Sequence, residues 1–147
     1  MKIILLDTNV VISGLLNPHG ASCKILELVM NGKLQTVSSR HLIDELRRAL
    51  EYERVAGLLA RRGWIEADFD EFCYLYNRIC KLTSDTPPSE KICLDPDDDW
   101  LFSCAEEAGA ENIISGDKKV NDVKEHKGIR IVTPKDFLDA LGYSLTK

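Results

Sequence analysis

This 147-residue sequence lacks the features that are typical of membrane proteins, secreted proteins and proteins with disulfide or zinc frameworks. It has no apolar run near the roughly 18 residues of a membrane span. A strand-like run follows Met1 and Lys2 directly, so we expect no signal peptide. The five cysteines are odd in number and include no CxxC pair, which argues against a disulfide framework and a zinc knuckle. We therefore expect reduced core cysteines in a cytoplasmic protein with no membrane partner.

The sequence also lacks the positive net charge that is typical of nucleic-acid-binding proteins. It has 24 acidic and 19 basic residues, which give a net charge of −5. The segment 85–99 carries six acidic residues and one lysine and accounts for the whole excess. The segment 46–62, in contrast, carries five arginines and two glutamates, which is compatible with a local basic face. Because the same arginines also fit an ordinary solvated helix, charge alone does not identify a partner.

Apolar patterning predicts that strands alternate with helices, in a chain whose length fits a single domain over residues 1–147. Short apolar runs predict strands at 3–6, 34–37, 81–84, 112–115 and 129–132. Helical spacing predicts helices at 10–16, 22–31, 38–50, 54–62, 68–80, 99–108 and 134–141, and a turn with a short helix near 117–125. This alternation predicts an α/β fold, a three-layer α/β/α sandwich with a central parallel sheet.

Two aspartates follow predicted strands directly. Asp7 closes the first apolar run, and Asp117 follows a later strand through Ser115 and a glycine. Because the carboxyl ends of parallel strands open onto one crevice, we expect these carboxylates to converge there. Thr8 and Asn9 should lie beside Asp7 as supporting polar groups, as Ser115 should beside Asp117. The alternative for Asp7 is that it only caps the following helix.

Further acidic residues stand where helices are predicted. The run 97–99 precedes a helical pattern, and the positive end of a helix dipole favours ionised carboxylates. Three adjacent aspartates cannot all face one ion, so we expect Asp99 to be the ligand and Asp97 or Asp98 to be secondary. Glu45 lies at the edge of the buried side of its helix. The run also fits an acidic helix start, and Glu45 a solvated helix face, with no ligand role.

Converging carboxylates repel one another unless a cation lies between them. Hard divalent ions such as Mg²⁺ or Mn²⁺ are the usual partners of carboxylate oxygens. The positions of these acidic residues therefore predict a metal site.

The segments 4–13, 38–46, 95–99 and 115–118 resemble, in their order and spacing, the motifs of the PIN-domain family. The chain is most similar in pattern to the bacterial and archaeal VapC-like toxins of type II toxin-antitoxin systems, over nearly its whole length. The resemblance implies a Mg²⁺- or Mn²⁺-dependent endoribonuclease that hydrolyses RNA phosphodiester bonds. It also implies a cognate antitoxin and frequent self-association. The acidic quartet that it implies is Asp7, Glu45, Asp99 and Asp117.

The chain departs from this family at one position. Relatives often carry a further acidic residue shortly after the element that contains Asp117, where this chain has Lys119. An ammonium group there would repel a second ion, so we expect one strongly held ion unless Asn121 or Asp122 completes a second site. Four basic residues are plausible contacts for RNA phosphates: Arg40, Arg47, Arg48 and Lys118.

Three other functions share some of these features, but each of them fits the sequence less well. A receiver-type phosphoacceptor also places acidic residues at strand ends, but it needs an acidic pair after the first strand, where Asp7 is followed by Thr8. A phosphatase with an Asp-x-Asp nucleophile is disfavoured because position 9 is Asn. The third is a PIN-fold module that binds RNA or protein without cleaving, and intact acidic residues at four positions argue against it.

The middle helices carry more large apolar side chains than one short sheet face readily covers. We expect these residues either to form a surface for a second subunit or an antitoxin, or to complete the monomer core. They are Leu58, Leu59, Trp64, Phe69, Phe72 and Tyr76.

Overall fold

The computed structural model describes residues 1–143, in which six strands form one mixed sheet of order β3-β2-β1-β4-β6-β5. The first five strands of that order are parallel to their neighbours, and only β5 is antiparallel. The strands are β1 (Ile3–Leu6), β2 (Gln35–Ser38), β3 (Lys81–Leu82), β4 (Asn112–Ile114), β5 (Glu125–His126) and β6 (Ile129–Val132). The expected central parallel sheet is confirmed, with an antiparallel strand added at one edge.

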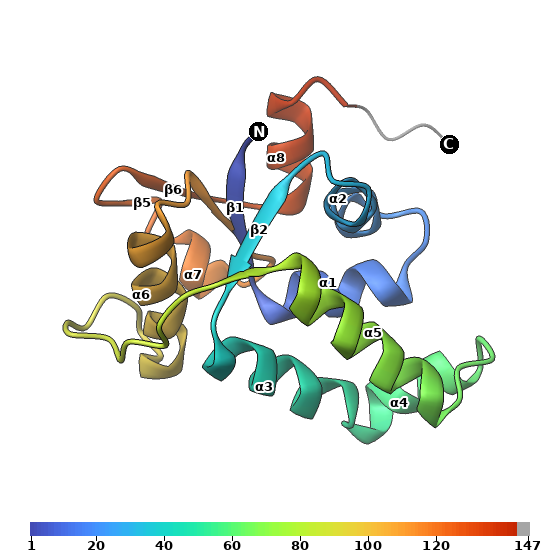
Figure 1. Ribbon diagram of the computed structural model, residues 1–147. Coiled ribbons are helices and arrows are strands. Elements are labelled where there is room, and N and C mark those ends of the chain that lie inside the picture. The colour runs from blue at the N-terminus through green and yellow to red at the C-terminus, as the bar shows by residue number, and fades with distance from the viewer. Residues whose placement is uncertain (144–147) are drawn as a thin grey trace.

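Helices cover both faces of this sheet, as the α/β/α prediction requires. They are α1 (Thr8–Leu16), α2 (Ala21–Met30), α3 (Arg40–Leu50), α4 (Glu53–Ala60), α5 (Glu66–Ile79), α6 (Asp99–Ala108), α7 (Lys118–Asn121) and α8 (Pro134–Ala140), with a 3₁₀ turn η1 (Pro96–Asp98) before α6. Side chains from α1, α2, α4, α5 and α8 fill one apolar cluster, and those from α6 and α7 fill the other. In Figure 1, α6 lies on the opposite side of β1 and β2 from α1 and α5.

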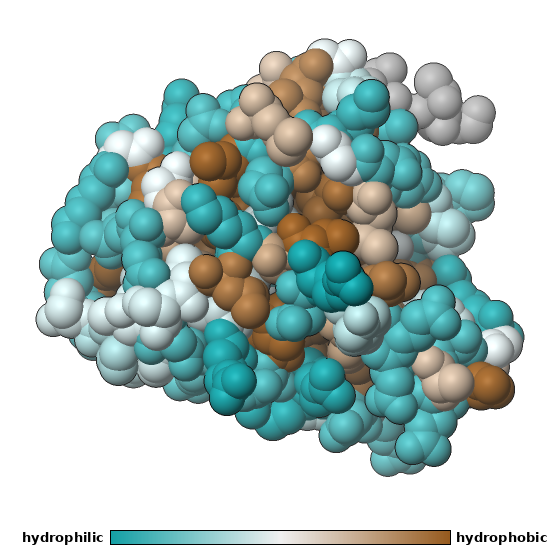
Figure 2. Space-filling view, viewed as in Figure 1, coloured by the Kyte–Doolittle hydropathy of each residue, from teal (hydrophilic) through white to brown (hydrophobic). Residues whose placement is uncertain are grey.

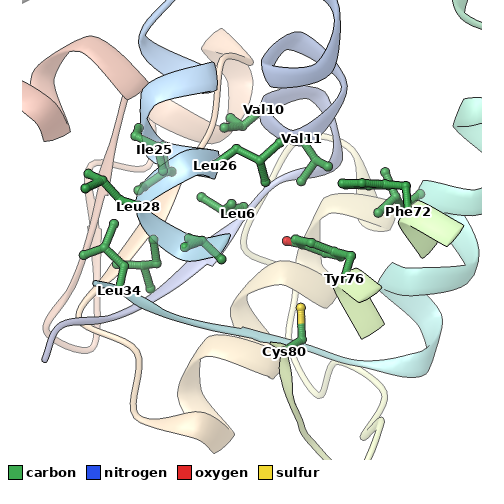
Figure 3. Packing of buried hydrophobic residues seen from close by; sticks show 14 of the residues in the cluster. Leu6, Val10, Val11, Ile25, Leu26, Leu28, Leu34, Phe72, Tyr76 and Cys80 are labelled. Carbon is green, nitrogen blue, oxygen red and sulfur yellow. The ribbon is translucent and has the colours of Figure 1, made fainter. Parts of the chain in front are cut away.

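The side-chain alternation of β1 explains why its sequence is apolar throughout. Ile4 and Leu6 point into the cluster beneath α1 and α2, whereas Leu5 points into the cluster beneath α6. Figure 3 shows Leu6 beneath the side chains of α1 and α2, with Phe72 and Tyr76 of α5 nearby. A central strand buried on both faces places its carboxyl end deep in the molecule.

After β4 the sequence predicts a turn and a short helix near 117–125, and the structure has helix α7 within that range. The sequence does not predict the strand that follows. Helix α7 ends at Asn121, and the chain then forms β5, which pairs with β6 through a tight turn at Lys127 and Gly128. Both turn residues have positive φ, 50° and 84°, as a two-residue hairpin turn of this hand requires. A two-residue polar strand has no apolar alternation, so the sequence pattern could not reveal it.

The apolar residues of the middle helices largely complete the monomer core. Leu59, Phe72 and Tyr76 are buried, and Trp64 and Phe69 are half-buried against the same cluster. Of the two expectations for these residues, the structure matches the one that needs no partner. Self-association therefore has no support from this part of the chain.

Large apolar residues on the surface are scattered. Examples are Ile65, Tyr74 and Leu94, which lie on different segments. Figure 2, which has the same view as Figure 1, shows hydrophilic side chains interrupted by smaller apolar patches on this face. No helix within residues 1–143 combines the length and the apolar character needed to cross a membrane.

We expect Leu59→Ala to lower the free energy of unfolding by about 2–5 kcal/mol, because the Leu59 side chain is 0% exposed and its removal leaves a cavity. Leu94, which is 73% exposed, is the matched control, and Leu94→Ala should change stability by less than about 0.5 kcal/mol. Denaturant unfolding measures both, and equal effects would contradict the core assignment.

Candidate metal centre

The carboxylate of Asp7 is fixed at the carboxyl end of β1 by hydrogen bonds from two sides. Asp7 is only 6% exposed. Its Oδ2 accepts a hydrogen bond from Ser115 Oγ at 2.7 Å and another from Asn9 Nδ2 at 3.0 Å. Its backbone N–H donates to the carbonyl of Ile114 at 2.9 Å and extends the pairing of β1 with β4. Two side chains thus hold Oδ2 of Asp7 in place.

A short network joins the ends of β1 and β4 and positions Asp117. Gly116 N donates to Asn9 Oδ1 at 2.9 Å, and Asp117 N donates to Ser115 Oγ at 3.0 Å. Asp117 Oδ1 accepts from Lys119 N at 2.9 Å, so this carboxylate also caps α7. A Cβ at Gly116 would lie 3.3 Å from Asn9 Oδ1, a tight contact that would require the Asn9 side chain to shift by a few tenths of an ångström. The network brings Asp117 to the same edge of the sheet as Asp7.

Glu45 is positioned by the firmly anchored start of α3. Ser39 Oγ accepts from Leu42 N at 3.3 Å, and Asp85 Oδ1 accepts from His41 N at 2.9 Å. One helical turn before Glu45, the His41 ring stacks on Trp100 with ring centres 3.8 Å apart and planes at 6°. Since Trp100 belongs to the first turn of α6, this stack couples Glu45 to the acidic run.

Within the acidic run, the structure brings Asp98 to the other carboxylates and directs Asp99 away from them. Asp99 is 4% exposed, and its Oδ1 accepts from Ile92 N at 3.1 Å and from Cys93 N at 2.7 Å. Its carboxylate therefore fastens the preceding loop to α6. Asp98 lies on the wall of the acidic cavity, and Asp97 is exposed. The expectation that Asp99 is the principal ligand does not fit this geometry, because successive residues of a helical turn point in directions about 100° apart.

The cavity that holds these carboxylates has a volume of about 480 Å³. Asp7, Glu45, Asp98 and Asp117 form its acidic part, with Thr8 and Asn9 beside them. The rest of its wall was not foreseen from the sequence. It comprises Ile12, Ser13, Leu16, Ala49, Tyr52 and Val55. Residues one helical turn after Asn9 or Glu45, such as Ser13 and Ala49, could have been sought by spacing, but their chemistry gave no signal.

Burial and mutual repulsion raise the pKa of two of the carboxyl groups. The pKa of Asp7 rises to about 6, chiefly because burial disfavours the charged form, with further repulsion from Glu45 and Asp117. The pKa of Asp98 rises to about 7 through burial and repulsion from Asp7, Asp95, Asp117 and Glu45. Asp7 and Asp98 thus both lie close enough to Glu45 and Asp117 to be repelled by them, which places the four groups in one site.

This arrangement fits a hard divalent cation. The site offers carboxylate oxygens from four segments, and none of the residues that line its cavity is basic. A cation between the groups would relieve the repulsion that raises the pKa values of Asp7 and Asp98. We therefore assign Asp7, Glu45, Asp98 and Asp117 as the residues that could hold Mg²⁺ or Mn²⁺.

The residues considered for a second ion lie elsewhere. The Lys119 side chain is exposed and does not line the acidic cavity. Asn121 Nδ2 donates to the carbonyls of Ser115 at 2.7 Å and Asp117 at 3.0 Å, and Asp122 forms an ion pair with Lys118 at 3.0 Å. Neither Asn121 nor Asp122 lines the acidic cavity.

None of the candidate RNA-contacting residues lines the acidic cavity. Arg40, Arg48 and Lys118 are exposed. Arg47 is exposed too, but it lines a different cavity, between α3, α4 and α5. A wider cavity, of about 840 Å³, lies at the amino ends of the strands, and none of the four acidic residues lines it. Chemistry therefore points to the smaller, acidic cavity.

Comparisons with known proteins agree with this geometry. A family model described as "PIN domain" matches residues 3–119. An uncharacterized protein of Methanocaldococcus jannaschii is 26% identical over 144 residues, which cover 92% of this chain and 89% of that protein. This chain is similar in structure to a chain of VapBC2 from Rickettsia felis, with a TM-score of 0.58. That crystal structure shows VapBC2 bound to a DNA fragment from its promoter. That likeness covers 90% of this chain and 98% of the other at 12% identity, and so supports the fold alone.

We expect Asp7→Asn to stabilise the metal-free protein at pH 8 by an amount on the order of 2 kcal/mol, because it removes a buried charge. The folded-state pKa of about 6 lies above the ordinary value of 3.8. Below about pH 4 Asp7 is protonated and its burial costs no stability. As the pH rises through 6 the buried group ionises, and the free energy of unfolding falls. Thermal unfolding in EDTA should show a gap between variant and wild type at pH 8 that closes near pH 4, and equal melting temperatures at pH 8 would contradict this.

Proposed function

Because this chain belongs to the PIN domain family, we propose that it is a divalent-metal-dependent endoribonuclease that hydrolyses RNA phosphodiester bonds. The observation that carries the proposal is the convergence of Asp7, Glu45, Asp98 and Asp117 on one cavity at the carboxyl edge of the sheet. Four carboxylates without a basic neighbour on the cavity wall are poorly suited to bind a polyanion directly, but they are well suited to bind the cations that accompany one.

Asp7, Glu45, Asp98 and Asp117 would hold Mg²⁺ or Mn²⁺, which would supply Lewis-acid polarisation of the scissile phosphate and activation of a water nucleophile. The residues of the chain fix the position of that chemistry. Ser115 and Asn9 hold one oxygen of Asp7 and leave the other for a ligand role. The His41–Trp100 stack keeps the start of α3, and with it Glu45, next to the first turn of α6.

The surroundings of the site suit an RNA backbone. Arg40, Arg48 and Lys118 are exposed near the ends of the elements that carry the carboxylates, and they are candidate phosphate contacts. Arg47 is a weaker candidate because it faces another cavity. Phosphate contacts at the rim would position the backbone without selecting a sequence.

We also propose that the chain is the toxin of a toxin-antitoxin pair and acts in the cytoplasm. The support is the fold that it shares with a chain of the Rickettsia felis VapBC2 structure. Pairing with an antitoxin, and self-association, are therefore proposals that follow from the fold. Light scattering of the purified chain, alone and together with the product of a neighbouring gene, would test both.

The nuclease proposal is tested with purified protein and a pooled single-stranded RNA, in the presence of either Mn²⁺ at about 5 mM or EDTA. A millimolar concentration suits a weakly bound hard cation. We expect cleavage in Mn²⁺ and none in EDTA. Metal should also raise the melting temperature, since a ligand at about 100 times its dissociation constant stabilises the fold by roughly 2.7 kcal/mol. RNA binding without cleavage would instead indicate a non-cleaving module.

The acidic run provides the sharpest test of the site. Asp98→Asn should reduce cleavage by at least about 100-fold, because asparagine lacks the negative charge of a metal ligand. The fold should change little, because asparagine has nearly the same shape as aspartate. The adjacent Asp97→Asn is the matched control, and activity should be nearly unchanged because Asp97 is exposed and lies outside the cavity. Equal loss in both variants would show that Asp98 has been misassigned.

Asp99→Asn should behave differently from both. Asp99 accepts two backbone hydrogen bonds, so its substitution should lower the melting temperature and reduce cleavage only as far as the loop is displaced. Thermal unfolding and the cleavage assay on the same protein separate the two effects. Full loss of cleavage at an unchanged melting temperature would restore Asp99 as a ligand.

A further inference from the structure

A second group of metal-ligating side chains lies away from the acidic cavity. Glu90, Glu106 and His126 each offer one ligand atom, and these three atoms lie within 4.8 Å of one another. The residues come from the loop before α6, from α6 itself and from β5. None of them lines the cavity of Asp7 and Asp98.

The imidazole of His126 lies within ion-pair distance of the two carboxylates, but the geometry of neither contact is that of a hydrogen bond. Its Nε2 atom is buried and has no hydrogen-bond partner among residues 1–143, and the side chain is only 14% exposed. Nε2 lies 3.4 Å from Glu106 Oε2 and 3.6 Å from Glu90 Oε1, longer than ordinary hydrogen bonds. The ring packs edge-on against Phe102, with centres 5.4 Å apart and planes at 84°. A buried ring nitrogen without a partner is costly and calls for a ligand.

We propose that Glu90, Glu106 and His126 bind a zinc ion. Zn²⁺ takes nitrogen and oxygen ligands at about 2.0–2.2 Å in a tetrahedral arrangement, which puts neighbouring ligand atoms about 3.3 Å apart. The separations of 3.4 and 3.6 Å from His126 Nε2 to the two carboxylate oxygens come close to that edge length. One imidazole and two carboxylates favour Zn²⁺ over Mg²⁺, which prefers oxygen ligands alone.

Lys127 adjoins this group and sets its affinity. Its Nζ lies 2.8 Å from Glu106 Oε1 and 3.2 Å from Glu90 Oε1. Glu106 thus meets Lys127 through one oxygen and faces His126 with the other, so an ion at Oε2 leaves the Glu106–Lys127 bond intact. The Lys127 bond also holds the pKa of Glu106 below its usual range, which keeps a ligand ionised. Glu90, in contrast, offers the same oxygen, Oε1, to His126 and to Lys127, so an ion bound there displaces the ammonium group from Glu90. Lys127 is 59% exposed and can turn towards solvent.

Zinc bound there would connect three segments that the fold otherwise joins through an ion-pair cluster. Glu90 belongs to the long loop that leads to Asp98, Glu106 lies on the helix that follows Asp98, and His126 lies on the edge strand. The ion would fasten this loop to α6 about two helical turns from the acidic cavity. Its role in this chain is therefore structural, and it is separate from the ion that the acidic cavity holds.

Zinc titration of the full-length chain by calorimetry tests the proposal, with excess Mg²⁺ present to occupy oxygen-only sites. We expect one zinc ion per chain, bound equally well by wild type and by Asp7→Asn. His126→Gln should weaken binding at least tenfold, because even the supporting residues of zinc ligands are worth about 10–100-fold. Glu90→Gln should weaken it as well, and Lys127→Met should tighten it by removing a positive charge.

Two further measurements make the result decisive. Circular dichroism reports whether His126→Gln folds. If it does not, Glu90→Gln decides alone, since Glu90 is half exposed and its substitution should leave the fold intact. Cobalt substitution should give the visible absorption of a tetrahedral site that is lost in Glu90→Gln. The proposal is overturned if no zinc binds in the presence of Mg²⁺, or if binding is unchanged in His126→Gln and Glu90→Gln.

Discussion

The hydrogen bond from Ser115 Oγ to Asp7 Oδ2, 2.7 Å long, is the contact on which the acidic site depends. It crosses from the end of β4 to the end of β1, and it exists because these strands are parallel neighbours in register, with Leu6 opposite Ile114. A buried carboxylate is costly, and hydrogen bonds to its charged form offset part of that cost. The protein thus keeps a destabilising group at a fixed position, which is what a metal ligand requires.

The sequence predicted the strand-end part of this site well and the loop part poorly. Asp7 and Asp117 follow apolar runs directly, so their position at one edge of a parallel sheet follows from the chain alone. The acidic run offers three adjacent aspartates. Whether Asp98 or Asp99 faces the cavity depends on how the first turn of α6 is rotated about the helix axis. That rotation is set by the bonds from Ile92 N and Cys93 N to Asp99, which no local pattern encodes.

The loop before α6 shows why such details escape local reasoning. Its short pairing at β3 is followed by residues without regular structure, and tertiary contacts hold them in place. Glu107 accepts hydrogen bonds from Ser84 at 2.6 Å, and Ser103 Oγ donates to the carbonyl of Thr86 at 2.6 Å. Each contact joins a loop residue to α6 across 17 or more positions. The position of Asp98 is therefore a property of the whole fold.

Charge links metal binding to the approach of RNA. Four clustered carboxylates repel a phosphate backbone, and the basic candidates lie outside the cavity, so the site is unsuited to RNA until its charge is offset. Protons can do this, since Asp7 and Asp98 have pKa values of about 6 and 7, but a protonated carboxylate is a poor metal ligand. Near neutral pH, protons and a divalent ion compete for the same oxygens. If the chain is the metal-dependent ribonuclease that we propose, metal binding there would release protons, make the cavity less negative and favour RNA binding, so that RNA would in turn favour the metal-bound form by linkage.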